Sequence, residues 1–125
     1  MNLVDSSAWL EYFADTPNAE HFAKTIEDSA NLVVPSIVLF EVFKRILQQE
    51  GQDAAMRAVN SMHEGQVVYL DESLALSAAR LGVQFKLPMA DSIILATAQQ
   101  FEATIWTQDE DFEGIPGVKY FPKKM

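Results

Sequence analysis

Short apolar segments of three or four residues alternate with longer amphipathic segments along this 125-residue chain. The short segments are typical of buried strands, and the longer ones have the apolar spacing of helices. Strands that alternate with helices favour a parallel sheet covered by helices on both faces. We therefore expect an α/β fold. The expected strands cover residues 2–4, 31–34, 67–70, 104–107 and 118–121.

The expected helices have recognisable start and stop residues. Gly51 and Gly65 follow two of them, and Pro88 stands in the first turn of another. No repeat, low-complexity tract or linker interrupts the pattern, so residues 1–125 are expected to form one domain. The expected helices cover residues 6–13, 19–29, 36–49, 52–64, 72–85 and 88–101.

Composition excludes several classes of protein. The chain has no cysteine, which excludes a disulfide framework, a thiolate zinc site and a cysteine nucleophile. Its first residues lack the basic region of a signal peptide. No apolar run approaches the roughly 18 residues that span a bilayer. We therefore expect a soluble, cytoplasmic protein that does not enter a membrane.

The net charge is −9, from 18 acidic and 9 basic residues. Most of these acids are expected to form a solvated surface. The balance argues against a nucleic-acid-binding protein that works by phosphate neutralisation alone, because such proteins usually present a basic face. It does not argue against a nuclease, since bound metal ions can supply local positive charge.

Four acidic residues stand inside or directly after apolar runs: Asp5, Glu41, Asp91 and Asp109. A buried carboxylate without a partner commonly costs several kcal/mol or shifts its pKa strongly. A shared Mg²⁺ or Mn²⁺ explains such acids economically, because these hard cations take carboxylate oxygens as ligands. Asp5 and Asp109 also follow expected strands, and ligands of open α/β sheets bind beyond the carboxyl ends of the strands.

Two of these acids also have an ordinary structural interpretation. Asp5 could cap the helix that follows it, although Ser6 or Ser7 could do the same. Glu41 lies on the polar side of its helix and could form an ion pair with Arg45, four residues on. Taken alone, the structural interpretation of Glu41 is the stronger one.

Asp91 and Asp109 are harder to explain in structural terms. Asp91 lies on an apolar stripe with Ile94, Leu95 and Ala98. A nearby helix N-terminus stabilises an anion by only about 0.3–1 kcal/mol, which is less than the cost of burying it. Asp109 begins an acidic loop that would usually be solvated, but it adjoins the end of a strand.

Other chemistries find less support. His21 and His63 lie in amphipathic segments away from the acids, so neither supports a Ser-His-Asp nucleophile. No glycine-rich phosphate loop is present. A glycosidase-like pair of carboxylates is conceivable, but four dispersed acids on a compact α/β chain disfavour it.

The acids belong to four longer motifs, which are Val4-Asp5-Ser6-Ser7, Pro35-Ser36 to Glu41-Val42, Leu87-Pro88-Met89-Ala90-Asp91-Ser92-Ile93-Ile94 with Ala96-Thr97-Ala98, and Thr107-Gln108-Asp109-Glu110-Asp111-Phe112. Each motif is weak alone, but all four in this order form a strong pattern. On these motifs the chain resembles the PIN-domain ribonucleases. In size and layout it resembles the VapC toxins of type II toxin–antitoxin systems, over nearly its whole length.

The resemblance implies a three-layer PIN-like fold with a five-stranded parallel sheet between helices. It implies four catalytic acids, Asp5, Glu41, Asp91 and Asp109, of which the three aspartates would be metal ligands. Asp111 is a fifth candidate, and Ser7 and Thr107 stand where the family often has a supporting hydroxyl. At position 108 this chain has Gln, where many relatives have a shorter polar residue such as Asn. We expect this difference to affect the detail of the loop and not the set of metal ligands.

The resemblance also implies a function. We expect a Mg²⁺- or Mn²⁺-dependent endoribonuclease, the toxin of a toxin–antitoxin pair, inhibited by a VapB-like antitoxin. A homodimer is expected, because VapC-like proteins usually pair and the segments 19–29 and 36–49 carry many large apolar side chains. Two alternatives remain open: a metal-binding RNA or protein interaction module without hydrolytic activity, and a metal-dependent phosphatase acting on a small phosphoester.

Overall fold

The computed structural model of the protein describes residues 1–124. Five parallel strands form one sheet in the order β3-β2-β1-β4-β5. This confirms the predicted α/β fold with a parallel five-stranded sheet flanked by helices. The strands are β1 (Asn2–Val4), β2 (Leu32–Pro35), β3 (Gln66–Val68), β4 (Thr104–Thr107) and β5 (Val118–Tyr120).

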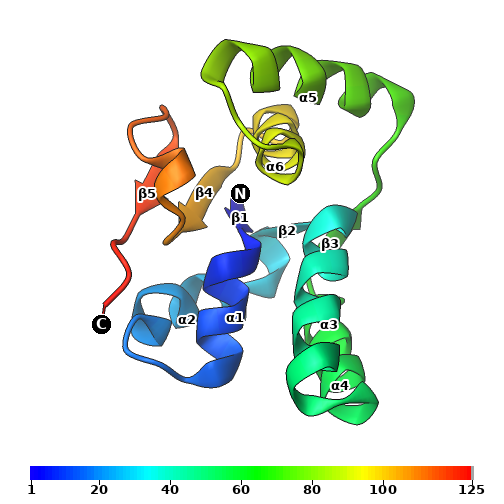
Figure 1. The fold of residues 1–125 in the computed structure, drawn as a ribbon, viewed down its shortest axis with the longest axis vertical. Coiled ribbons are helices and arrows are strands. Elements are labelled where there is room, and N and C mark those ends of the chain that lie inside the picture. The colour runs from blue at the N-terminus through cyan, green and yellow to red at the C-terminus, as the bar shows by residue number, and fades with distance from the viewer. Residues whose placement is uncertain (125) are drawn as a thin grey trace.

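Helices α5 and α6 pack against each other on one side of the sheet, and α1 and α2 lie on the other side (Figure 1). Helices α3 and α4 form a pair beside the β2–β3 edge (Figure 1). No helix within residues 1–124 is long and apolar enough to cross a membrane. The helices are α1 (Ser6–Ala14), α2 (Ala19–Glu27), α3 (Ser36–Glu50), α4 (Gln52–Met62), α5 (Glu72–Phe85) and α6 (Met89–Gln100), with short 3-10 turns η1 (Ser29–Asn31) and η2 (Glu110–Phe112).

The element boundaries differ from the prediction in a few places. β3 ends at Val68, before the predicted end at residue 70, because Tyr69 and Leu70 turn out of the sheet and are 73% and 46% exposed. α2 ends two residues early, and η1 follows it. β2 includes Pro35, which pairs with Val68 and whose missing N–H is tolerated at the end of a strand.

Strand β1 is the centre of the hydrophobic core. It lies between β2 and β4, and Leu3 and Val4 are fully buried. The chain builds the sheet outward from β1 to β3 on one side and later adds β4 and β5 on the other. Strand order therefore reverses between β1 and β4, and the carboxyl ends of these two strands form the switch point at which open α/β sheets bind ligands.

A glycine sets how closely α5 approaches α6. A Cβ atom on Gly82 of α5 would lie 2.6 Å from the Oγ atom of Ser92 in α6. Ser92 follows Asp91 directly, so this contact helps to fix the helix that carries one of the predicted site acids.

Candidate metal centre and active site

The four predicted catalytic acids come from four separate parts of the chain and line one open cleft. Asp5 follows β1, Glu41 lies in α3, Asp91 lies in the first turn of α6, and Asp109 follows β4. The cleft has a volume of about 430 Å³ and opens at the switch point of the sheet. Its other lining residues are Ser6, Ser7, Leu10, Phe40, Lys44, Arg45, Gln48 and Ile94.

Asp5 is the most firmly held of the four acids. Its side chain is 2% exposed. The Oδ1 atom accepts hydrogen bonds from the Ser7 hydroxyl at 2.8 Å and from the Ala8 backbone N–H at 3.2 Å. The Oδ2 atom accepts a hydrogen bond from the Thr107 hydroxyl at 2.8 Å. Both hydroxyls predicted to support the site therefore contact Asp5, and Thr107 links the ends of β1 and β4.

Asp5 is also the N-cap of α1. The alternative in which Ser6 or Ser7 caps this helix is wrong, because both serines lie inside the first turn and their hydroxyls donate to acidic side chains. Capping does not neutralise the carboxylate. Burial raises the pKa of Asp5 to about 6, although the hydrogen bonds from Ser7, Thr107 and Ala8 oppose the shift.

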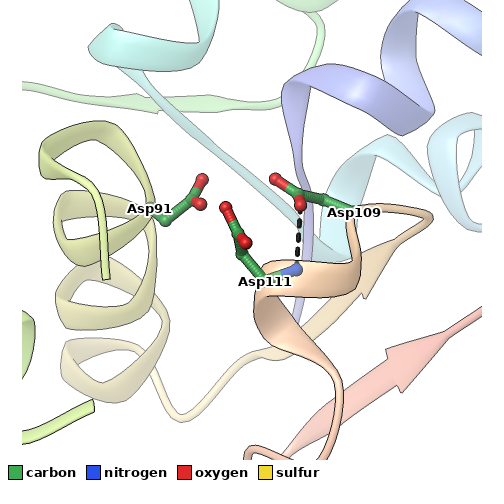
Figure 2. A group of neighbouring side chains, drawn as sticks. All are labelled: Asp91, Asp109 and Asp111. Carbon is green, nitrogen blue, oxygen red and sulfur yellow. Dashed lines mark hydrogen bonds between the residues drawn. The ribbon is translucent and has the colours of Figure 1, made fainter. Parts of the chain in front are cut away.

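Three other carboxylates converge across the cleft from two segments. Asp91 points from α6 toward Asp109 and Asp111 on the loop after β4 (Figure 2). One carboxylate oxygen from each residue lies within 4.8 Å of the others. The Asp111 backbone N–H donates a hydrogen bond of 2.9 Å to Asp109 Oδ1, which fixes the turn between these two acids. Asp111 is thus brought into the cluster together with Asp91 and Asp109.

Repulsion within this cluster is evident at Asp91, which is 8% exposed. Its pKa is raised to about 8 by burial, by the negative charge of Asp109, by a hydrogen bond to Asp111, and by the charges of Asp5 and Asp111. No basic side chain contributes to this shift. A divalent cation would compensate both the burial and the mutual repulsion, and three carboxylate oxygens at this spacing are suitable ligands for Mg²⁺ or Mn²⁺.

Glu41 lies on the wall of the cleft formed by α3 and accepts a hydrogen bond of 2.5 Å from the Ser6 hydroxyl. The suggested ion pair between Glu41 and Arg45 is not present within the described residues 1–124, where Lys124–Glu20 is the single salt bridge. Glu41 is therefore held by α1, across the cleft entrance, and not by its own helix. This contact spans 35 positions in sequence, which the helical pattern could not reveal.

A buried acid that the sequence motifs do not single out lies beside this site. Glu11 in α1 is 7% exposed, and it accepts hydrogen bonds from the Asn18 backbone N–H at 3.1 Å and from Gln108 Nε2 at 3.3 Å. The Asn18 side-chain amide in turn donates to Gln108 at 3.0 Å and to the Pro122 carbonyl at 2.9 Å. We call Glu11, Asn18 and Gln108 the amide network.

The amide network supports the loop that carries Asp109. Gln108 stands between Thr107 and Asp109, and its side chain reaches both Glu11 and Asn18. A shorter asparagine would not span these distances, so Gln108 has a larger structural role than the predicted effect on loop detail. Burial acts to raise the pKa of Glu11, but hydrogen bonds from Thr16, Asn18 and Gln108, with the nearby charge of Lys123, lower it overall.

Neither histidine reaches the cleft. His21 stacks on Phe121 with ring centroids 4.5 Å apart, and His63 is exposed at the end of α4. This agrees with their interpretation as structural or surface residues. The titratable side chains that line the cleft are therefore its carboxyl groups together with Lys44 and Arg45.

Comparison with known proteins identifies the family. The family model described as PIN domain matches residues 3–118. The chain belongs to the PIN domain family. This confirms the predicted resemblance, and the PIN fold accounts for the parallel sheet and its strand order.

Solved structures similar to this PIN domain cover almost the whole chain. A toxin–antitoxin complex from Klebsiella pneumoniae matches with a TM-score of 0.84 and 22% identity, over 98% of this chain and 100% of the other. VapC20 of Mycobacterium tuberculosis, described as a sarcin–ricin loop cleaving toxin, matches with a TM-score of 0.81 and 18% identity, over 98% and 100%.

FitAcB from Neisseria gonorrhoeae matches with a TM-score of 0.76 and 20% identity, over 98% of both chains. No curated protein matches this sequence significantly. At these identities the structural similarity establishes the fold alone.

Proposed function

We propose that this PIN domain is a Mg²⁺- or Mn²⁺-dependent endoribonuclease and the toxin of a toxin–antitoxin pair. The observation that carries the proposal is the convergence of Asp91, Asp109 and Asp111 within 4.8 Å, beside the buried Asp5. Four carboxylates at the switch point of a parallel sheet suit the hydrolysis of a phosphodiester.

The acidic cluster fits a divalent cation. Asp91, Asp109 and Asp111 would supply its oxygens, and Asp5 would join them directly or through water, because three hydrogen bonds leave its carboxylate with further accepting capacity. When bound, such an ion offsets charge on the phosphoryl oxygens and acidifies a water molecule.

The remaining groups of the cleft have complementary roles. Ser7 and Thr107 hold the two carboxylate oxygens of Asp5 and would fix its orientation in the cleft. Glu41, held by Ser6 and separate from the three-acid group, would orient an attacking water. Lys44 and Arg45 line the same cleft and would contact substrate phosphates.

The open shape of the cleft favours a polymeric substrate over a small phosphoester. Phe40 is 59% exposed on its rim, and Lys44 lies 5.8 Å from the centre of the Phe40 ring. An exposed aromatic ring beside cationic groups suits a single-stranded nucleic acid, because bases stack on such rings. Single-stranded or looped RNA is therefore the proposed substrate, with products that carry a 5′-phosphate and a 3′-hydroxyl.

The fold shared with the Klebsiella toxin–antitoxin complex supports a small VapB-like antitoxin as the partner. We expect the antitoxin to insert an arginine or lysine among the carboxylates, since the bidentate geometry of arginine suits carboxylates best. Co-purification with the untagged genomic neighbour tests this expectation. A structure of the inhibited complex with the acidic cleft left open would contradict it.

A homodimer in solution is also proposed. Of the two helices expected to supply its apolar surface, α2 buries Phe22 and Ile26 in the core, whereas α3 exposes Phe40 and Leu47. Further exposed apolar side chains lie on and next to α5, at Tyr69, Leu70, Leu76, Val83 and Met89, and offer a second face for pairing. Light scattering at tens of micromolar tests the assembly, and a clean monomer would contradict it.

The decisive experiment for activity uses the pure protein with structured RNAs. We expect cleavage that requires Mg²⁺ or Mn²⁺, stops with chelator, and leaves 5′-phosphate ends. The Asp91→Asn variant is the matched control for a contaminating nuclease. Hydrolysis of p-nitrophenyl phosphate without RNA cleavage would favour the phosphatase alternative. Metal-dependent RNA binding without cleavage would favour the interaction module.

A further inference from the structure

A second cavity adjoins the acidic cleft and has no role in the chemistry described so far. It has a volume of about 510 Å³ and runs along α1 between α3 and the C-terminal segment; we call it the α1 groove. Ser7, Leu10 and Ala14 lie on its α1 side, Arg45 and Gln49 on its α3 side, and Lys123 and Lys124 on its C-terminal side.

The α1 groove is continuous with the acidic cleft. Ser7, Leu10 and Arg45 line both cavities, so a polymer leaving the acids over the first turn of α1 enters the groove directly. Helix α1 extends from Ser6 to Ala14, which corresponds to about 12 Å at 1.5 Å per residue. This length accommodates a few nucleotides of a single strand.

The two cavities gather positive charge in a chain of net charge −9. Four of its nine basic residues line them: Lys44, Arg45, Lys123 and Lys124. Within residues 1–124, neither Arg45 nor Lys123 takes part in a salt bridge, and the contact of Lys124 with Glu20 is 4.0 Å long between exposed groups.

Two acids, Glu11 and Glu50, also line the α1 groove. They compensate only part of its positive charge. Glu11 is buried and accepts hydrogen bonds from Asn18 and Gln108, and the charge of Lys123 helps to lower its pKa, so Glu11 offsets part of the Lys123 charge without forming a salt bridge with it. Glu50 lies at the last residue of α3 and is exposed. Arg45 lies at the junction with the cleft and forms no salt bridge with an acid of residues 1–124, including Glu41 four positions before it.

We propose that the α1 groove binds the RNA strand on one side of the scissile phosphodiester, with Arg45 contacting a phosphate at the junction and Lys123 contacting one farther along. This inference rests on the proposed ribonuclease function and adds a location for the substrate strand. Phosphate contacts from Arg and Lys position a nucleic acid without reading its sequence. Leu10, on the groove floor, offers apolar contact to a ribose or base.

An RNA strand fits these observations better than an acidic peptide, because the groove leads directly into the carboxylates that would cleave the strand. A peptide with enough negative charge to use Arg45 and Lys123 would meet the repulsion of Asp5 and Glu41 at the junction. A phosphodiester chain meets the same acids at the position where bound cations would attract it.

The test measures binding and cleavage separately. For binding, the Asp91→Asn background prevents turnover, and fluorescein-labelled single-stranded RNAs of 3 and 12 nucleotides are titrated in Mg²⁺ by anisotropy. In this background Arg45→Gln and Lys123→Gln are each expected to weaken binding of the 12-mer about 3- to 10-fold. Each is also expected to reduce the slope of log affinity against log salt by about 0.7.

The controls have the same charge change at remote positions. Arg80→Gln in α5 and Lys24→Gln in α2 should leave the affinity for the 12-mer unchanged, and Lys123→Gln should leave the affinity for the 3-mer unchanged. With Asp91 restored, both Arg45→Gln and Lys123→Gln are expected to raise KM for RNA cleavage, and Lys123→Gln, remote from the acids of the cleft, is expected to leave kcat unchanged. A folding defect would instead reduce the active fraction and kcat.

Two results would overturn the inference. The first is a 12-mer affinity and KM for Arg45→Gln and Lys123→Gln equal to those of the remote controls. The second is loss of a co-purifying protein partner in these variants while RNA affinity stays constant, which would make the groove a protein-binding surface. A wild-type protein that cleaves no RNA would instead contradict the proposed function, so the two failures are distinguishable.

Discussion

Glu11 and Asp91 are both buried carboxylates beside the loop that follows β4, but their surroundings shift their pKa values in opposite directions. Glu11 belongs to the amide network, in which N–H groups of Asn18 and Gln108 donate to both of its oxygens. Asp91 faces Asp109 and Asp111, which donate nothing to it when ionised. The pKa of Glu11 is lowered, and that of Asp91 is raised to about 8.

The difference shows that burial alone does not define a functional acid in this fold. Burial acts to raise the pKa of both residues. Hydrogen bonds and the Lys123 charge outweigh burial at Glu11, whereas the neighbouring negative charges add to its effect at Asp91. Glu11 has its charge satisfied by the protein and stabilises the structure. The negative charge of Asp91 is repelled by Asp109 and Asp111. Such an arrangement is expected where a bound cation completes the site.

The largest expected effect follows from Asp91→Asn. RNA cleavage should fall by a hundredfold or more, because a carboxylate oxygen of the cluster is lost. The metal-free stability should rise by an amount on the order of 1 kcal/mol, since a buried and repelled charge is removed. Activity assays and thermal melts, with Mg²⁺ and with chelator, measure both. A variant that is destabilised in both conditions would make Asp91 a structural residue, and wild-type cleavage would refute its assignment.

Glu11→Ala should have the opposite consequence for stability. It leaves the Asn18 backbone N–H and Gln108 Nε2 buried without their acceptor, which is expected to cost about 2–4 kcal/mol. Urea denaturation measures the loss, and Glu20→Ala on the exposed side of α2 is the matched control. An effect no larger than that of the control would show that the amide network does not depend on the Glu11 charge.

The two carboxylates should also give the metal-free protein opposite pH dependences. The folded-state pKa of Asp91, about 8, exceeds its ordinary value of 3.8, so its contribution to stability is complete below about pH 4 and is lost as pH rises through 8. Asp5 adds the same trend between 3.8 and about 6. Glu11, with a lowered pKa, contributes stability above 4.5 that is lost as pH falls.

Stability of the metal-free protein should therefore decline from about pH 5 to pH 8, by an amount on the order of 1 kcal/mol or more. Asp91→Asn should flatten this decline, and Mg²⁺ should reverse it. Denaturation across pH with chelator provides the measurement. A stability that rises steadily to pH 8 without metal would show that the cluster is not repulsive.

Gln108→Asn should give the smallest effect. The shorter side chain keeps the amide but cannot reach both Glu11 and Asn18, so about 1 kcal/mol of stability should be lost. RNA cleavage should fall a few-fold because Asp109 is less firmly placed. An unchanged Mg²⁺ dependence and cleavage rate would mean that the loop after β4 is held in place without this residue.

Several features of the protein are determined by its sequence alone. The alternation of apolar strands with amphipathic helices specifies the α/β class, because side-chain periodicity is a local property. The four motifs specify the family and the acids that share the cleft. Glu41 shows what helical periodicity cannot reveal. Periodicity alone puts Glu41 on the polar face of its helix, whereas the family motif indicates a site residue.

Only the tertiary structure decided which carboxylates have their charged form stabilised by hydrogen bonds and which have it destabilised by neighbouring negative charges. Glu11 stands in the apolar run Trp9-Leu10-Glu11-Tyr12-Phe13, so it carried the same signal as Asp5 and Asp91. Its donor Gln108 is 97 positions away, whereas Asp91 meets Asp109 and Asp111 from another segment. A carboxylate's charge state depends on the donors and charges within a few ångströms, and in this chain the fold brings those groups from distant segments.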